Sequence, residues 1–302
     1  MTAGTALTTG TLTAAAELLR ALGSVPLSPP PRCEPVLAAL GLPAPTAAEH
    51  TGVFVLSAPP HAAIHLGGEG KLGGEGLDRV AGFWRVIGLT PPSDADHLGL
   101  LLMLYAELTD AEAVARTAAA RERLRHARVV LLREHLWSWA PGYLTAVSRL
   151  AGPALTAWAE LTLRALHGEA GSEVASRPAP LPAALRDAPC PVAPGDSREE
   201  LLDSLVAPVR SGVLLTREDL RAGAASAGLG FRVGERRYTL AAMLDQDADA
   251  TLDWLSGHAR MWARSHARQR PVSGNDPRHW WTRRAAQTAH ALRTLQGQLV
   301  PL

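Results

Sequence analysis

Cysteine and aromatic residues are scarce in this chain of 302 residues. Only Cys33 and Cys190 occur, each within two residues of prolines and far from the other in sequence, so neither a disulfide framework nor a paired-cysteine metal motif is expected. Aromatic residues make up 5% of the sequence, runs of β-branched residues are rare, and alanine, leucine and arginine dominate. Because unbranched side chains lose little rotamer freedom in a helix, this composition predicts an all-α protein.

The patterns of common catalytic and metal sites are also missing. The sequence has no His-Glu-x-x-His, no Gly-x-Ser-x-Gly, no Cys-x-x-Cys and no glycine fingerprint between a strand and a helix. His61 and His65 are four residues apart and could share a helix face, but prolines precede them, glycines follow them and no third ligand is evident, which favours a polar loop. We therefore expect no enzyme activity, no metal and no cofactor.

Long apolar runs are absent as well, and no amino-terminal leader is expected. The longest uncharged apolar stretch, Leu98 to Ala106, is too short to cross a bilayer. The first nineteen residues carry no Lys or Arg, so they do not form a twin-arginine signal. Together with the few cysteines, these features predict a protein that works in the reducing cytoplasm.

Glycine is concentrated in two copies of Leu-Gly-Gly-Glu-Gly at residues 66–70 and 72–76. The Gly70-Lys71 pair is similar to part of a phosphate-binding P-loop. However, the first glycine of that motif is His65 here, and Leu72 stands where a hydroxyl should hold magnesium. We therefore interpret the repeat as a structural turn.

The overall charge of +1 is unevenly distributed along the chain. Residues 255–302 contain eight arginines and one acidic residue, Asp276, for a charge of +7, whereas the other 254 residues carry 22 bases and 28 acids, for −6. Together with Trp280-Trp281, these arginines could bind nucleic acid or anionic lipid. A solvated helix and tail is the favoured interpretation, with a protein partner as the next.

Apolar spacing predicts several helices and leaves two segments open. The Ala/Arg-rich segment Ala111 to Arg128 is polar enough to form an exposed helix. The run Val53 to Leu56 could be extended, and Phe231 to Tyr238 could form a small hairpin. Helices are expected over residues 77–87, 98–108, 129–139, 142–150, 153–167 and 252–268.

The most specific segment lies at residues 91–108. Pro91 and Pro92 disfavour helix, and a polar stretch ending in Asp96-His97 then runs directly into an apolar helix. Asp94 or Asp96 is predicted to accept hydrogen bonds from the first free N–H groups of that helix. A ligand-facing or hinge role for Asp96-His97 is favoured over a purely structural cap. A catalytic dyad is disfavoured, because no nucleophile lies at a recognisable spacing.

This segment resembles the hinge motif of the TorD/DmsD family, cytoplasmic chaperones of exported molybdenum enzymes, in which a proline, a spacer and Asp-His precede an apolar helix. Further stretches in family order extend the resemblance to roughly residues 15–265, although Leu occupies the acidic position that follows Asp-His in the family. These stretches are residues 77–89, 132–141, 208–212 and 234–237.

The resemblance implies a bundle of about ten helices in two lobes. Six prolines between Gly171 and Gly195 cannot sustain a helix and predict a connection between lobes, which would permit the exchange of lobes in a homodimer. We expect a TorD-like helical core at 11–170, a proline-rich connection at 171–197, a C-terminal helical segment at 198–270 and a basic tail at 271–302.

The resemblance also implies a function. The chain is expected to bind the twin-arginine signal peptide and the immature catalytic subunit of a molybdopterin oxidoreductase, and to aid cofactor insertion before export. The alternative is a nucleic-acid-associated helical protein that acts through its arginine-rich end. Tryptophans on apolar helix faces are more often core than binding residues. The candidate peptide-binding residues are Pro92, Asp94, Asp96, His97, Leu100, Leu101, Trp84, Trp137, Trp139 and Pro141.

Overall fold

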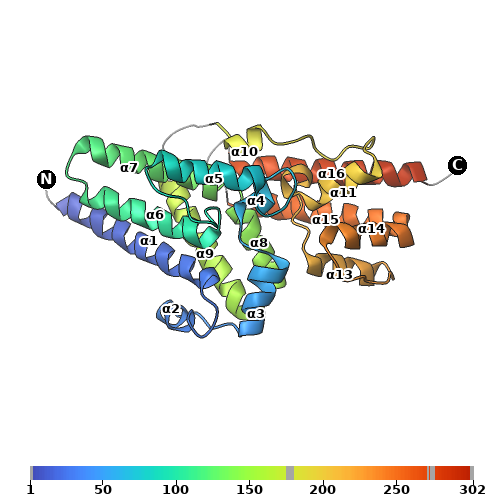
Figure 1. Cartoon of the computed structure of the whole chain (residues 1–302), viewed down its shortest axis with the longest axis horizontal. Helices are drawn as coiled ribbons and strands as arrows, with labels where there is room; N and C mark the ends of the chain where they lie inside the picture. Colours follow the sequence, from blue (N-terminus) through green and yellow to red (C-terminus); the bar gives the residue numbers. More distant parts are fainter. Residues whose placement is uncertain (1–2, 175–179, 271, 273–275, 300–302) are drawn as a thin grey trace. The chain divides into compact units, whose positions relative to one another are not determined.

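The computed structural model describes residues 3–174, 180–270, 272 and 276–299, and these residues form an all-α fold, as predicted (Figure 1). They contain no strand; a single isolated bridge pairs the backbones of His61 and His97. Two π-helical segments are labelled η. The elements are α1 (Ala3–Leu27), α2 (Glu34–Ala39), α3 (Ala47–Thr51), η1 (Gly52–Ser57), α4 (Ala62–Leu66), α5 (Gly74–Val86), α6 (Leu98–Val114), α7 (Ala118–Val130), η2 (Leu131–Leu136), α8 (Ala140–Leu150), α9 (Pro153–Val174), α10 (Ala183–Arg186), α11 (Arg198–Val206), α12 (Pro208–Ser211), α13 (Arg217–Ser226), α14 (Arg236–Gln246), α15 (Ala248–Arg268) and α16 (Pro277–Leu299).

The described part of the chain holds more helices than the expected ten or so, because several, such as α10 and α12, are single turns. None of the helices in these residues is long and apolar enough to span a membrane. The chain divides into two compact units. The N-terminal unit contains α1–α3, η1, α5–α9 and η2; the C-terminal unit contains residues 63–74 and α10–α16.

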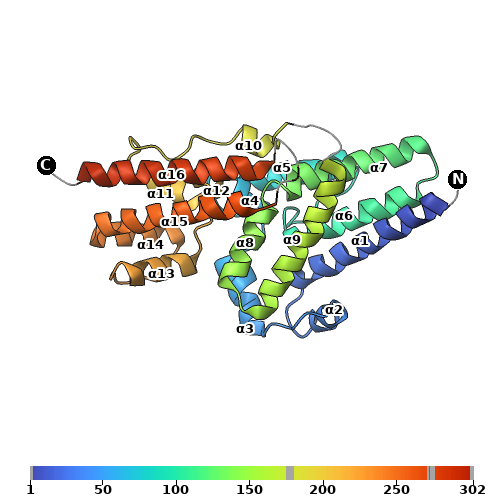
Figure 2. The same ribbon diagram turned by 180° about the vertical axis from the view of Figure 1, so that it is seen from behind.

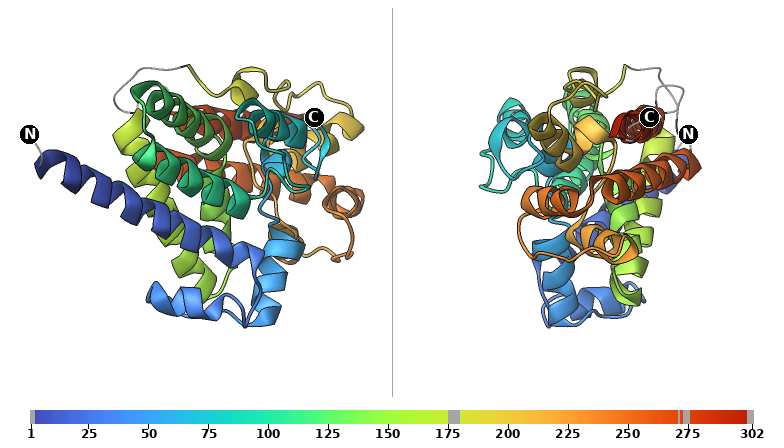
Figure 3. Two further views of the ribbon diagram at one scale, coloured as in Figure 1. Left: turned by 60° about the vertical axis from the view of Figure 1, so that its left-hand side comes forward. Right: turned by 90° about the vertical axis from the view of Figure 1, so that its right-hand side faces the viewer.

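Within the N-terminal unit, α1 packs along α6, and α8 lies beside α9 (Figures 2 and 3). The crossing of α1 and α6 requires glycine, since a Cβ atom on Gly23 would lie 2.7 Å from the carbonyl oxygen of Gly99. Trp158 of α9 is fully buried and donates its indole N–H to the carbonyl oxygen of Leu22, at 3.0 Å. The first residues of α6 are therefore held tightly against α1.

Within the C-terminal unit, α15 and α16 form a helical hairpin that carries much of the core. Residues 277–299 were expected only as part of a basic tail, but they form α16. The buried side chains of Trp281, Ala285 and Leu292 recur at helical spacing along it. Its Thr288 hydroxyl donates to the carbonyl oxygen of Ser211, at 2.8 Å. The arginine-rich end is thus partly a structural helix.

The two segments that could have been β-structure, residues 53–56 and 231–238, are not strands. Residues 53–56 lie in η1, because α3 begins with a Thr46–Glu49 capping box and continues directly into η1. Phe54 there packs edge-to-face on Trp158, at 5.1 Å. Residues 231–235 form no hairpin, and α14 starts at residue 236. The amide of Gln246 binds both the N–H and the carbonyl of Gly230, replacing the partner that a second strand would supply.

Candidate functional site

The predicted hinge lies at the start of α6, and its cap differs from the expected one. The Nδ1 atom of His97 accepts the N–H of Gly99 at 3.0 Å, so the histidine itself is the N-cap. The expectation that Asp94 or Asp96 caps this helix is wrong. Asp94 is exposed, and Asp96 is buried.

Asp96 instead faces residues 60–62, which pair with the hinge through their backbones. The N–H of Leu98 donates to the carbonyl of Pro60 at 2.7 Å, and the N–H of Ala62 donates to the carbonyl of Asp96 at 3.1 Å. His61 Nδ1 donates to the Asp96 carboxylate at 3.2 Å, and its ring lies edge-on to that of His97, with centroids 5.0 Å apart. His61 therefore belongs to the hinge, a role that its spacing from His65 did not indicate.

Burial sets the protonation of His97. Loss of solvation, followed by the nearby His61, lowers the pKa of His97 to about 4, although Asp94 and Asp96 act in the opposite direction. The imidazole is therefore neutral at neutral pH. Since Nδ1 accepts the Gly99 N–H, the proton resides on Nε2. In this geometry the imidazole acts as a helix cap.

The structure places the ten candidate residues at different depths. Asp94 is exposed, whereas Pro92, Trp84 and Leu100 are half-buried. The indole N–H of Trp84 donates to the Ala95 carbonyl at 3.1 Å, so this tryptophan joins the hinge. The buried candidates are Asp96, His97, Leu101, Trp137, Trp139 and Pro141.

Trp137, Trp139 and Pro141 lie at the junction of η2 and α8, where their neighbours are other core groups. Trp139 donates its indole N–H to the His135 carbonyl at 2.8 Å and packs against Tyr143. The ring of Trp137 lies edge-on to that of His167, with centroids 5.9 Å apart. In this arrangement the two tryptophans are core residues, and exposing them would require a conformational change.

An apolar cavity of about 620 Å³ opens elsewhere in the N-terminal unit, between α5, α6 and α7. None of the ten candidate residues lines it. Two features of the sequence indicate it: apolar residues end α5, and Ala120, Leu124 and Ala127 recur at helical spacing on the otherwise polar α7. The lining residues are Phe83, Val86, Ile87, Leu108, Ala120, Arg123, Leu124, His126, Ala127 and Val130.

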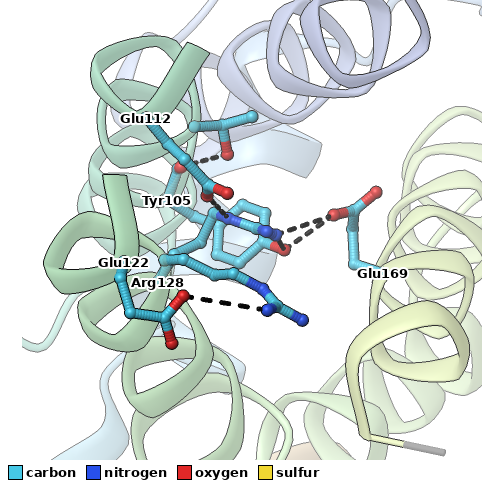
Figure 4. Close-up of polar contacts among 7 residues, drawn as sticks. Tyr105, Glu112, Glu122, Arg128 and Glu169 are labelled. Atoms are coloured by element: carbon cyan, nitrogen blue, oxygen red, sulfur yellow. Dashed lines mark hydrogen bonds and ion pairs between the residues drawn. The ribbon is translucent and has the colours of Figure 1, made fainter. Parts of the chain in front are cut away.

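A buried charged cluster fixes α7 beside this cavity (Figure 4). Arg128, 1% exposed, is the one fully buried residue of α7. Its Nε donates to the Glu112 carboxylate at 2.9 Å and its Nη1 to the Tyr105 hydroxyl at 2.7 Å. Tyr105 in turn donates to the Glu169 carboxylate at 2.6 Å, and burial raises the pKa of its phenol. The cluster therefore ties α7 to α6 and α9, a set of contacts that sequence patterns did not reveal.

In the C-terminal unit, the glycine-rich loop and two of the resembling stretches meet at a polar cavity of about 520 Å³. Gly70 has a φ of +64°, and a Cβ atom there would clash with the backbone at residues 206–207. Arg236 donates to the carbonyls of Gly70 and Leu215, at 2.8 and 3.1 Å. The loop is thus a tightly packed turn. Its cavity is lined by Gly68, Glu69, Gly70, Lys71, Glu200, Asp203, Val206, Arg210, Glu235, Arg236 and Arg237.

The arginine-rich end offers no exposed stacking platform in the described residues. Trp280 and Trp281 are 8% and 6% exposed and pack edge-to-face on each other. Arg284 lies over the Trp280 ring at 4.5 Å and donates to the carbonyl of Pro189, so it has a structural role. Among the described residues, no group of three or more His, Cys, Asp or Glu could hold a metal ion.

Comparison with protein families identifies one match. Residues 7–144 match the family of the nitrate reductase delta subunit. This segment contains the hinge and every residue that lines the apolar cavity. No curated protein and no solved structure matches the chain. Residues 7–144, slightly less than half of the chain, are therefore similar to a family of chaperones for redox-enzyme maturation, which supports the resemblance to TorD/DmsD chaperones.

Proposed function

We propose that this protein is a non-enzymatic chaperone of the cytoplasm. It binds the twin-arginine signal peptide and the immature catalytic subunit of a molybdopterin oxidoreductase until the cofactor has been inserted. One observation carries the proposal: the segment that matches the chaperone family, residues 7–144, also forms an apolar cavity beside the hinge helix α6.

The immature subunit calls for apolar binding surface, and its signal peptide calls for carboxylates as well. An immature subunit exposes apolar surface that must be kept from self-association, and each Å² of apolar surface removed from water contributes about 25 cal/mol. Its signal peptide offers an apolar helix preceded by two arginines. A receptor for that peptide needs an apolar groove with carboxylates at one end.

Carboxylates of this kind lie at the hinge. Asp94 is exposed two residues before the buried Asp96, and Glu107, which pairs with Arg20 of α1 at 3.4 Å, lies further along α6 on its exposed side. Leu100 is half-buried, whereas Leu101 is fully buried. We therefore infer that Asp94 contacts the peptide in the closed form, and that opening at Pro92–His97 is needed before Leu101 can contribute to a groove.

Two hinge variants test this assignment with a synthetic twin-arginine signal peptide. Asp94→Asn removes an exposed charge, and we expect it to weaken peptide binding about threefold to tenfold in calorimetry. The double variant Asp96→Ala with His97→Ala should weaken binding further while circular dichroism shows unchanged helical content.

His97→Asn serves as the control, because asparagine is a good N-cap and preserves that role of the side chain. Because His97→Asn keeps the cap, loss of binding in this variant assigns recognition to the imidazole, whereas binding that survives in it but not in the double variant assigns the effect to Asp96 or to the cap. Peptide affinity that stays at the wild-type value in both Asp94→Asn and the double variant would refute the assignment.

A further inference from the structure

The ionisable side chains at the rim of the apolar cavity between α5, α6 and α7 are all basic. Among its lining residues the only ionisable side chains are Arg123 and His126, and both are exposed. Neither has an ion-pair partner among the described residues. No carboxylate lines the cavity. An occupant therefore meets apolar walls and a basic edge.

The surrounding helix strengthens this bias. Besides the buried and paired Arg128, α7 carries three exposed arginines and one glutamate, Glu122, which lies 4.0 Å from Arg125. A segment that begins with two arginines would place positive charge against this rim. By contrast, a segment with carboxylates beside its apolar residues could form charge-assisted hydrogen bonds with the guanidinium of Arg123.

Apolar groups at the mouth of the cavity are left uncovered by the described residues of the N-terminal unit. Val86, at the end of α5, is 85% exposed, while Ile87 and Leu124 are half-buried. Phe83 and Leu108 lie deeper, at 8% and 7% exposed. The volume of about 620 Å³ lies within the range of about 300–1,000 Å³ that is common for ligand sites. Exposed apolar surface of this kind marks an interaction site.

We propose that this cavity binds an amphipathic helix of a protein partner that presents an apolar face flanked by Glu or Asp. The inference rests on the proposed function, in which the partner is the immature catalytic subunit. It assigns the cavity to an acidic segment of that subunit, while the two arginines of the signal peptide bind elsewhere. The site is thus a second point of client contact, selected by charge.

Two labelled synthetic peptides test the proposal on the full chain. They share leucines and alanines at positions i, i+3, i+4 and i+7, and one carries glutamate and the other lysine at the polar positions. At low salt we expect the glutamate peptide to bind at least tenfold more tightly in fluorescence anisotropy. Equal binding, or tighter binding of the lysine peptide, would overturn the proposal.

Three variants locate the binding. Val86→Asp places a carboxylate at the mouth of the cavity and should weaken binding of the glutamate peptide at least tenfold. Val55→Asp is the matched control, because Val55 is 61% exposed in the same unit and does not line the cavity. Arg123→Glu should reverse the preference toward the lysine peptide. If Val86→Asp and Val55→Asp have the same effect, the cavity is not the site.

The outcome is separable from that of the proposed function, which is tested by co-purification of a molybdenum-enzyme subunit with the tagged chain. Capture of that subunit without discrimination between the peptides refutes the cavity assignment alone. Discrimination between the peptides with no molybdenum-enzyme subunit captured refutes the client and leaves an acidic helix as the ligand of the cavity.

Discussion

Two cavities in the described part of the chain, one in each compact unit, differ in the charges that line them. In the polar cavity of the C-terminal unit, Arg237 pairs with Glu199 and Asp203, and Arg236 binds two backbone carbonyls. In the apolar cavity of the N-terminal unit, Val86 is exposed and Arg123 has no carboxylate partner among the described residues. The lining of the first cavity carries as many acidic as basic side chains, whereas that of the second carries no acidic side chain, so binding of an acidic partner is expected at the second.

The units also differ in their number of buried histidines with a lowered pKa. Acidification is therefore expected to give the largest difference in stability between them. Burial is the first cause that lowers the pKa of His97 and His135 in the N-terminal unit, and of His266 in the C-terminal unit, to about 4 in each case. Between about pH 6.5 and pH 4 the unfolded chain binds protons at these sites and the folded chain does not.

Stability should therefore fall as the pH decreases through that window, by about 3 kcal/mol for each histidine. Two of the three lie in the N-terminal unit, so its free energy of opening should fall about twice as far. Hydrogen exchange followed by mass spectrometry at pH 7 and pH 4.5, corrected for intrinsic rates, measures each unit. Equal losses in the two units would contradict the prediction.

The buried arginine of the N-terminal unit gives the next largest effect. Arg128→Met leaves the Glu112 and Glu169 carboxylates buried without their cation, and we expect it to lower the free energy of unfolding by about 3–5 kcal/mol. Urea denaturation measures the change. Arg125→Met is the matched control on the same helix, because its exposed pair with Glu122 should contribute less than about 1 kcal/mol. A similar loss in both variants would show that the cluster does not anchor α7.

A smaller loss of stability is expected when either of two glycines in the C-terminal unit is replaced by alanine, and its size should depend on the surroundings of the glycine. Gly212 and Gly228 have φ values of +71° and +70°, but only at Gly212 would a Cβ atom clash, with the backbone of α16. Both glycine-to-alanine variants suffer backbone strain of about 1–2 kcal/mol. Gly212→Ala should lower the free energy of unfolding by about 1–3 kcal/mol more than Gly228→Ala does, because the added Cβ atom overpacks the contact with α16. Equal midpoints of thermal unfolding would mean that α12 and α16 separate at little cost.

The sequence predicted most of the regular structure of the N-terminal unit. Apolar spacing indicated the helices at residues 77–87 and 98–108, which the structure shows as α5 and α6, with α6 extending to Val114. It missed α16, because the many arginines suggested a solvated tail. The buried positions Trp281, Ala285, Thr288 and Leu292 do follow a helical stripe, but the polar residues between them obscure it.

The candidate site was predicted less well, for a physical reason. The motif at residues 91–97 carried the resemblance to the chaperone family, but its geometry depends on His61, which is 35 residues from Asp96 in sequence. The apolar cavity requires three helices to converge. Neither the pairing of Asp96 with His61 nor the position of Phe83 beneath α7 follows from local spacing.

By itself, the sequence determined that this protein is helical, where α5, α6 and α15 lie, and that a proline-stiffened Asp-His pair precedes a buried helix. These properties depend on rotamer entropy, apolar periodicity and local backbone chemistry, all of which act within a few residues. Only the tertiary structure decided that His97 caps α6, that Arg128 is buried between two glutamates, and that Val86 remains uncovered. Those outcomes depend on burial and on partners from distant helices, because the free energy of a charged or apolar side chain is set by what surrounds it after folding.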